Sequence, residues 1–124
     1  MEDPRSKIIE IMLEFPEAEC ISRNDNPHMS LEVRKKRFGY FLDDHHGDGR
    51  IAINCKTTDD VRTMLEAVVP HQMHVPKYLG SKGWIGMWID SPEAEWGPVR
   101  DALLQAYKRT APKKLLAELE QGRA

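Results

Sequence analysis

Hydrophobic residues recur along this chain at two different spacings, which divide it into predicted helices and strands. A recurrence every three to four residues predicts a helix, and alternation with polar residues predicts a strand. The helical spacing begins after Asp3 and Pro4, which are typical of a helix cap and a first helical residue, and Pro16 ends it. The apolar stripe of this first predicted helix contains Ile8, Ile9, Met12 and Leu13.

Alternation follows in four segments, 18–24, 28–33, 37–42 and 51–55, which are joined by short polar links. Strands that follow one another so closely predict an antiparallel meander. The turn Arg34-Lys35-Lys36 between the second and third strands has no glycine, so the sequence leaves its type open. In the third strand, strict alternation predicts one face with Phe38, Tyr40 and Leu42 and the other with Arg37, Gly39 and Phe41.

The second half of the chain predicts a helix over 57–70, a strand over 84–89 and two helices over 91–111 and 113–120. The helix over 57–70 and the strand over 84–89 are separated by the segment 70–82, which contains two prolines. A connection that long in a small domain is often functional. The element order is therefore α-β-β-β-β-α-β-α-α. This order predicts an α+β fold in a single domain over residues 1–124, with a five-stranded antiparallel sheet and helices packed on one face.

The strand over 84–89 has two contrasting faces. Its aliphatic face, which suits a core, consists of Ile85, Met87 and Ile89. The other face carries Trp84 and Trp88 on either side of Gly86. These two rings either pack beneath a helix or form an exposed aromatic platform, and the sequence leaves both arrangements open.

Charge is distributed unevenly along the chain. The net charge is −2 over 124 residues, which argues against tight non-specific binding of nucleic acid. Residues 1–20 carry six acids and two bases, whereas residues 96–116 carry five bases and one acid. A second basic cluster occupies residues 34–37. A protein with this pattern can still present a basic face.

Cysteine usage and hydropathy indicate where the protein works. Cys20 and Cys55 form no Cys-x-x-Cys pair, and we expect two reduced, buried thiols on strands. No apolar run approaches the roughly 20 residues that cross a membrane, and the first residues show no signal-peptide pattern. We therefore expect a cytoplasmic protein with no membrane partner.

Four segments of the chain resemble the MmcQ/YjbR family of small bacterial proteins. They are residues 28–41, 75–80, 83–86 and 96–114, and the loop with Gly83-Trp84 followed by Ala111-Pro112-Lys113 is the most specific part. The resemblance implies a fold similar to the bacterial frataxin CyaY. It also implies a DNA-binding role, described for the family as a double wing of β-hairpins. The family commonly has glycine in the basic hairpin turn, where this chain has Lys35.

Basic and aromatic residues around the predicted hairpin and loop form a candidate DNA-binding site. Cations at a hairpin tip can contact phosphate, and exposed rings can stack on bases with roughly 1–3 kcal/mol each. A basic turn can equally be a soluble turn that guards a sheet edge. The predicted contacts, in a weak or accessory DNA complex, are Arg34, Lys35, Lys36, Arg37, Lys77, Tyr78, Lys82 and Trp84.

Other kinds of chemistry have weaker support in the sequence. No nucleophile, phosphate-loop or zinc-protease motif is present, so we expect no enzymatic activity and no catalytic residue. Possible metal ligands occur in residues 43–48 and at His71 and His74, but they match no ligand signature, and we expect no metal or cofactor. The alternative function is a non-enzymatic module that binds a small molecule or a protein partner through the 70–82 loop and the tryptophan face.

Overall fold

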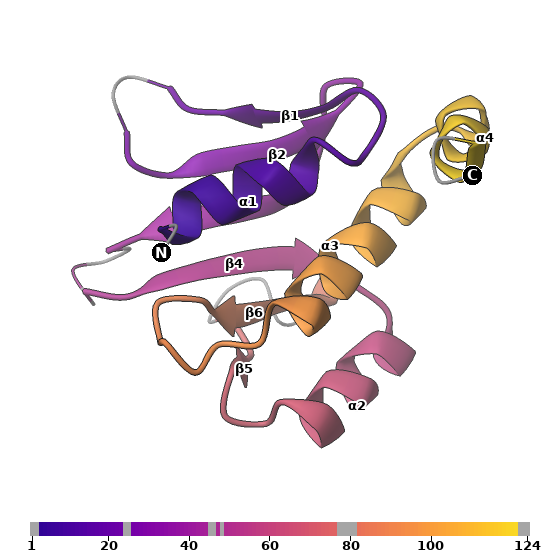
Figure 1. The fold of residues 1–124 in the computed structure, drawn as a ribbon. Coiled ribbons are helices and arrows are strands. Elements are labelled where there is room, and N and C mark those ends of the chain that lie inside the picture. Colours follow the sequence, from indigo (N-terminus) through magenta and orange to yellow (C-terminus); the bar gives the residue numbers. More distant parts are fainter. Residues whose placement is uncertain (1–2, 24–25, 45–46, 48, 77–81, 122–124) are drawn as a thin grey trace.

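The computed structural model describes residues 3–23, 26–44, 47, 49–76 and 82–121. Within these residues the chain forms four helices and six strands (Figure 1). Their bounds in chain order are α1 Pro4–Met12, β1 Ala18–Ile21, β2 Met29–Val33, β3 Lys36–Asp43, β4 Ile51–Lys56, α2 Asp59–Val68, β5 Met73–His74, β6 Trp84–Trp88, α3 Trp96–Thr110 and α4 Lys113–Gln121.

The strands form one antiparallel sheet with the order β1-β2-β3-β4-β6-β5. The prediction of an α+β fold with an antiparallel sheet is confirmed, but the predicted number of five strands is wrong. The additional strand is β5, in which Met73 and His74 pair with Met87 and Gly86. Two residues are too few to show alternation, so the sequence pattern assigned them to the extended segment 70–82.

The hydrophobic core lies between the sheet and the helices α1 and α3, which cross one of its faces (Figure 1). At its centre the buried Tyr107 ring of α3 contacts Phe15 at 5.1 Å and Phe38 at 5.8 Å between ring centres. The Tyr107 hydroxyl donates a 2.6 Å hydrogen bond to the Pro16 carbonyl. This bond satisfies a polar group within the core and ties α3 to the turn after α1.

A β-bulge interrupts the alternation of β3. Glu32 pairs with Arg37 and Leu31 pairs with Gly39, so Phe38 is an extra residue on β3. Phe38 consequently turns into the core against Tyr107, together with the buried Phe41. The predicted grouping of Phe38 with Tyr40 and Leu42 is therefore wrong, because the bulge shifts the phase and leaves those two on the opposite face with Arg37.

Both cysteines lie on strands as free thiols, as predicted, although Cys20 on β1 is only partly buried and Cys55 on β4 is fully buried. Burial raises the pKa of Cys20 to about 11 and that of Cys55 to about 12. Among the helices that the structure describes, none combines the length and the apolar character needed to span a bilayer.

Candidate functional site

The sheet face opposite α1 and α3, called the open face below, is crossed by no helix in the described part of the chain (Figure 1). The strand register aligns side chains across this face. One row runs through Tyr40, Asn54 and Gly86 to His74, and the next runs through Leu42 and Ala52 to Trp88. These rows of the open face therefore combine side chains from four neighbouring strands, and the first row includes Gly86, the glycine between the two tryptophans.

Three planar groups lie in a row on the open face, and we call this row the planar stack. The Arg37 guanidinium lies 4.7 Å from the centre of the Tyr40 ring, and the Tyr40 ring lies 5.6 Å from that of Trp84 with a tilt of 36° between the two planes. Arg37 also donates hydrogen bonds to the Tyr40 hydroxyl at 2.5 Å and to Ser30 Oγ at 2.8 Å. The bulge makes this stack possible, because it places Arg37 and Tyr40 on one face although they are three residues apart.

A buried carboxylate organises the polar groups beside this stack. Glu32 is only 6% exposed, and its Oε2 accepts a 2.5 Å hydrogen bond from Ser30 Oγ. Arg23 Nη2 lies 3.5 Å from the same oxygen. Because Ser30 in turn accepts from Arg37, a continuous chain of polar contacts holds both guanidinium groups against the sheet.

A hollow of about 290 Å³ opens on the same face, over β1 to β3. Its apolar lining comes from Ile21, Met29 and Leu42, and its polar lining includes Arg23 and Arg37. Asn26, His28, Ser30 and Tyr40 complete the lining. Arg37 and Tyr40 thus belong both to the planar stack and to the hollow, which makes the two features continuous.

Exposed cations of β3, of β4 and of the segments next to β3 and β6 lie at one end of the sheet, and we call this set the basic edge. Its members are Lys35, Lys36, Arg37, Lys56 and Lys82. Lys36 pairs with the buried Val33, so it belongs to this end of the sheet but lies on the other face from Arg37. The start of β3 lies beside the end of β4, where Lys56 pairs with Trp84 at the start of β6. The Thr57 amide donates a 2.9 Å hydrogen bond to the Gly83 carbonyl, which continues this pairing next to Lys82. Lys56 therefore lies between the hairpin cations and Lys82.

The hairpin tip itself departs from the predicted site. Arg34 and Lys35 both have positive φ, at 50° and 65°, which is the backbone of a two-residue type I′ turn. Arg34 donates two hydrogen bonds to the Glu17 carboxylate, from Nε at 2.6 Å and from Nη2 at 2.9 Å. These bonds lower the pKa of Glu17 and raise that of Arg34. Of the four predicted hairpin cations, Arg34 thus points to an acid beyond α1 and not to the open face.

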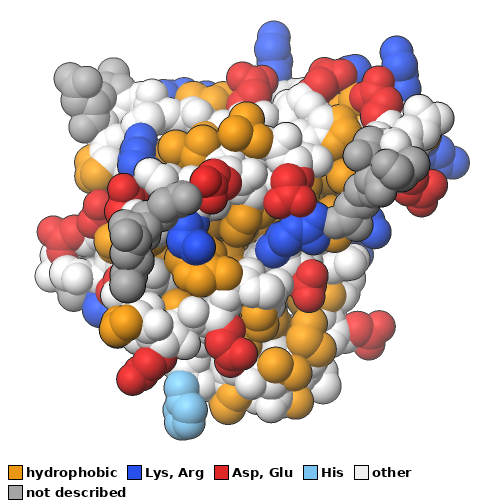
Figure 2. Space-filling model, in the orientation of Figure 1, with side chains coloured by type: hydrophobic (Ala, Val, Ile, Leu, Met, Phe, Trp, Pro, Cys, Tyr) orange, Lys and Arg blue, Asp and Glu red, His pale blue; other side chains and the backbone are white. Residues whose placement is uncertain are grey.

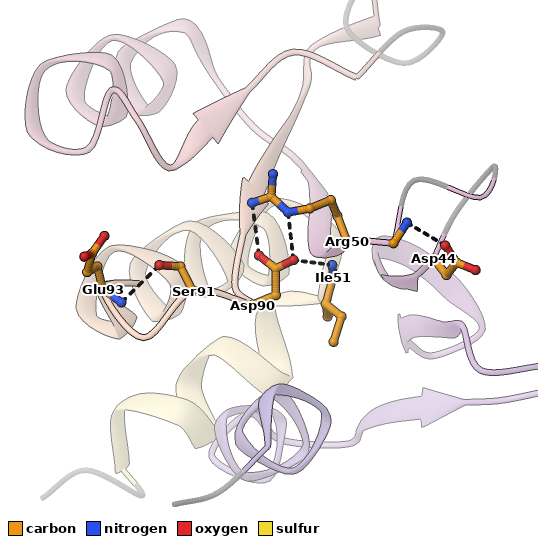
Figure 3. A network of polar contacts seen from close by, with 7 residues as sticks. Asp44, Arg50, Ile51, Asp90, Ser91 and Glu93 are labelled. Atoms are coloured by element: carbon orange, nitrogen blue, oxygen red, sulfur yellow. Dashed lines mark hydrogen bonds and ion pairs between the residues drawn. The ribbon is translucent and has the colours of Figure 1, made fainter.

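Trp88 is held between two other side chains. The His74 ring stacks on it at 4.0 Å, and the Arg50 guanidinium lies 4.2 Å from the same ring centre, so the two groups cover opposite faces of the indole. Figure 3 shows how Arg50 is fixed: Asp90 accepts from Arg50 Nε at 2.8 Å and Nη2 at 3.0 Å, and from the Ile51 amide at 3.0 Å. These hydrogen bonds lower the pKa of Asp90, and the bonds from Arg50 have the largest effect. Trp84 is therefore the better placed of the two tryptophans for contact with a ligand.

Several sequence predictions fall elsewhere. Lys77 and Tyr78 lie outside the described residues, as do His45 and His46. In the part of the chain that the structure describes, no group of three or more His, Cys, Asp or Glu side chains could hold a metal ion. Arg23, Tyr40 and Lys56 are not among the contacts that the sequence predicts. Lys56 could have been found by extending the alternation of Ala52 and Asn54 by one step, whereas Tyr40 depended on the bulge.

No protein-family model matches this chain, and a search of curated proteins finds no similar sequence. Among solved structures, the chain is similar to Deinococcus radiodurans protein DR2400, described with a DUF419 domain. The TM-score is 0.67 and the sequence identity 15%, over 94% of this chain and 87% of that chain. The resemblance to the MmcQ/YjbR family stays a prediction. At this identity the comparison shows that the chain shares the α+β fold of a DUF419-domain protein.

Proposed function

We propose that the protein binds nucleic acid through the basic edge of the open face. One observation carries the proposal: the sheet register places Lys56 of β4 beside Trp84, between Arg37 at the start of β3 and Lys82, which lies just before β6. Lysine and arginine side chains in such a cluster neutralise phosphates and release counterions, which is the main source of non-specific affinity. The five cations of the basic edge give it a charge of opposite sign to the net −2 of the whole chain.

On the helical side of the molecule, the described cations are accompanied by acids. Figure 2 shows this side, where acidic and basic side chains are interspersed. One such pair joins Arg100 of α3 to Glu14 at 2.8 Å. Mixed charges create little net field for a polyanion, so we expect binding at the basic edge alone.

The proposal is tested by fluorescence anisotropy with labelled oligonucleotides at about 50 and 200 mM salt. If four cations of the basic edge contact phosphate on a duplex, affinity should fall about 150-fold between these concentrations. A variant with Lys35→Gln, Lys36→Gln, Lys56→Gln and Lys82→Gln should lose both the affinity and most of the salt dependence.

A control variant loses the same number of positive charges at a different place, so it separates the effect of position from the effect of total charge. In this control, four exposed cations of α3 and α4 are replaced by neutral glutamine: Lys108→Gln, Arg109→Gln, Lys113→Gln and Lys114→Gln. We expect this control to bind nearly as well as the original protein. Equal losses in the two variants, or no binding at low salt, would contradict the proposal.

A further inference from the structure

We infer that the nucleic acid recognised by the open face is single-stranded, with one base stacked on Trp84 and another nucleotide of the same strand in the hollow over β1 to β3. This inference rests on the proposed function and specifies its ligand. It draws on the aromatic stack and the hollow, which the phosphate contacts of the basic edge do not require.

The planar stack favours unpaired bases. Arg37, Tyr40 and Trp84 form a row on a sheet surface, and the half-buried Trp84 ring is at one end of this row. The bases of a duplex are stacked on one another inside the helix, so a flat sheet cannot reach their faces. A single strand exposes these faces, and aromatic rings and guanidinium planes are the groups on which proteins stack them.

The hollow matches a single nucleotide in size and chemistry. Its volume of about 290 Å³ lies at the lower end of small-molecule sites, which span roughly 300–1,000 Å³. Ile21 and Leu42 provide apolar contact for a base or sugar, and Asn26 provides an amide for a base edge. A duplex is too wide for such a space, whereas one splayed nucleotide fits.

Two guanidinium groups at the hollow are oriented for a phosphate. An arginine has five N–H donors, and the Arg37 bonds to Ser30 and Tyr40 leave others for an anion. Arg23 lies on the other side of Ser30, next to the buried Glu32. The Glu32 carboxylate is almost fully buried, and it holds Arg23 directly and Arg37 through Ser30. It therefore positions both arginines while staying out of contact with the ligand.

The two subsites lie within reach of one strand. From β6, which carries Trp84, to β1 at the far side of the hollow there are four strand spacings. At about 4.8 Å each, these amount to roughly 19 Å. Tyr40 and Arg37 contribute to both subsites, so a bound strand would cross the sheet without a gap. Cations of the basic edge would contact the phosphates of the bound strand along the same path.

The test compares single strands of DNA and RNA with a duplex of the same sequence. Single strands should bind at least about 10-fold more tightly than the duplex at equal salt, and they should quench tryptophan emission. Trp84→Leu should weaken single-strand binding by about 5- to 160-fold and leave duplex binding nearly unchanged. Trp84→Phe keeps an aromatic ring and should retain most of the affinity, and Arg23→Gln should reduce it several-fold.

The outcomes separate this inference from the proposed function. Equal or tighter duplex binding, without an effect of Trp84→Leu, would overturn the single-strand inference and leave binding at the basic edge in place. Binding of neither ligand would refute the proposed function itself. If Trp84→Leu fails to fold, quenching of the unmodified protein by single strands and not by duplex decides the question. Single-strand binding that survives both Trp84→Leu and Arg23→Gln would also overturn the inference.

Discussion

The contact between His74 and Gly86 yields a sharp prediction about stability. A methyl group added at Gly86 would lie 2.2 Å from His74 Nε2, 2.5 Å from its Cε1 and 2.8 Å from Asn54 Oδ1. The backbone at Gly86 does not have a positive φ, so the effect of Gly86→Ala arises from this crowding alone. The imidazole would have to retreat by about 1 Å to reach ordinary contact distance.

The size of the effect follows from the contacts of the imidazole. Its displacement weakens the 4.0 Å stack on Trp88, and such stacks contribute about 0.5–1.5 kcal/mol. Overpacking in a well-packed region typically costs about 1–3 kcal/mol. The smaller entropy of the unfolded alanine chain offsets about 0.4–1 kcal/mol. We therefore expect Gly86→Ala to lower the free energy of unfolding by about 1–2 kcal/mol, as measured by urea denaturation.

A double-mutant cycle identifies the cause. In a His74→Ala background the imidazole is gone and only Asn54 Oδ1 remains close to the added methyl group, so Gly86→Ala should cost clearly less than in the original protein. If Gly86→Ala is neutral in the original protein, or equally harmful in both backgrounds, the crowding explanation is refuted.

Three further predictions concern the turn, an ion pair and the thiols. Lys35→Gly should raise the free energy of unfolding by about 0.5–1 kcal/mol, because glycine adopts φ = 65° without strain; lower stability in urea denaturation would contradict the turn geometry. Asp90→Asn should lower stability at neutral pH by about 1–2 kcal/mol. Because the pKa of Asp90 is lowered in the folded state, this difference should disappear as pH falls below about 4, which thermal melts across pH measure. Cys20 and Cys55 should react slowly with thiol reagents at pH 8 and rapidly in urea, because burial raises both pKa values; fast labelling of the folded protein would refute this.

Local signals in the sequence placed most elements correctly. Asp3 caps α1 as expected, with its carboxylate accepting from the Ser6 amide at 2.9 Å, and the Thr58 hydroxyl caps α2 at the Val61 amide. Proline positions and alternation located the four strands before α2 and the strand after the 70–82 segment. These features depend on neighbouring residues, which a sequence pattern contains.

Features that depend on distant partners were not predictable in the same way. The ion pair of Arg34 with Glu17 joins residues that are 17 positions apart, and it removes one cation from the predicted site. The bulge that moves Phe38 into the core arises from the register with β2. The His74 imidazole lies against Gly86 because β5 pairs with β6 at this point. A two-residue strand such as β5 leaves no periodic signal in the sequence. The residues of the open face therefore emerge only when the register is known.

The most direct test of the proposed interface is a map of amide and indole shifts in a ¹⁵N-labelled sample titrated with a short single-stranded oligonucleotide. The account predicts that the largest changes fall on the open face, at Lys56, Lys82, Trp84 and Arg37, with little change at Lys108 on α3. Changes confined to the helical side, or no changes at low salt, would contradict the assignment of the open face as a nucleic-acid-binding surface.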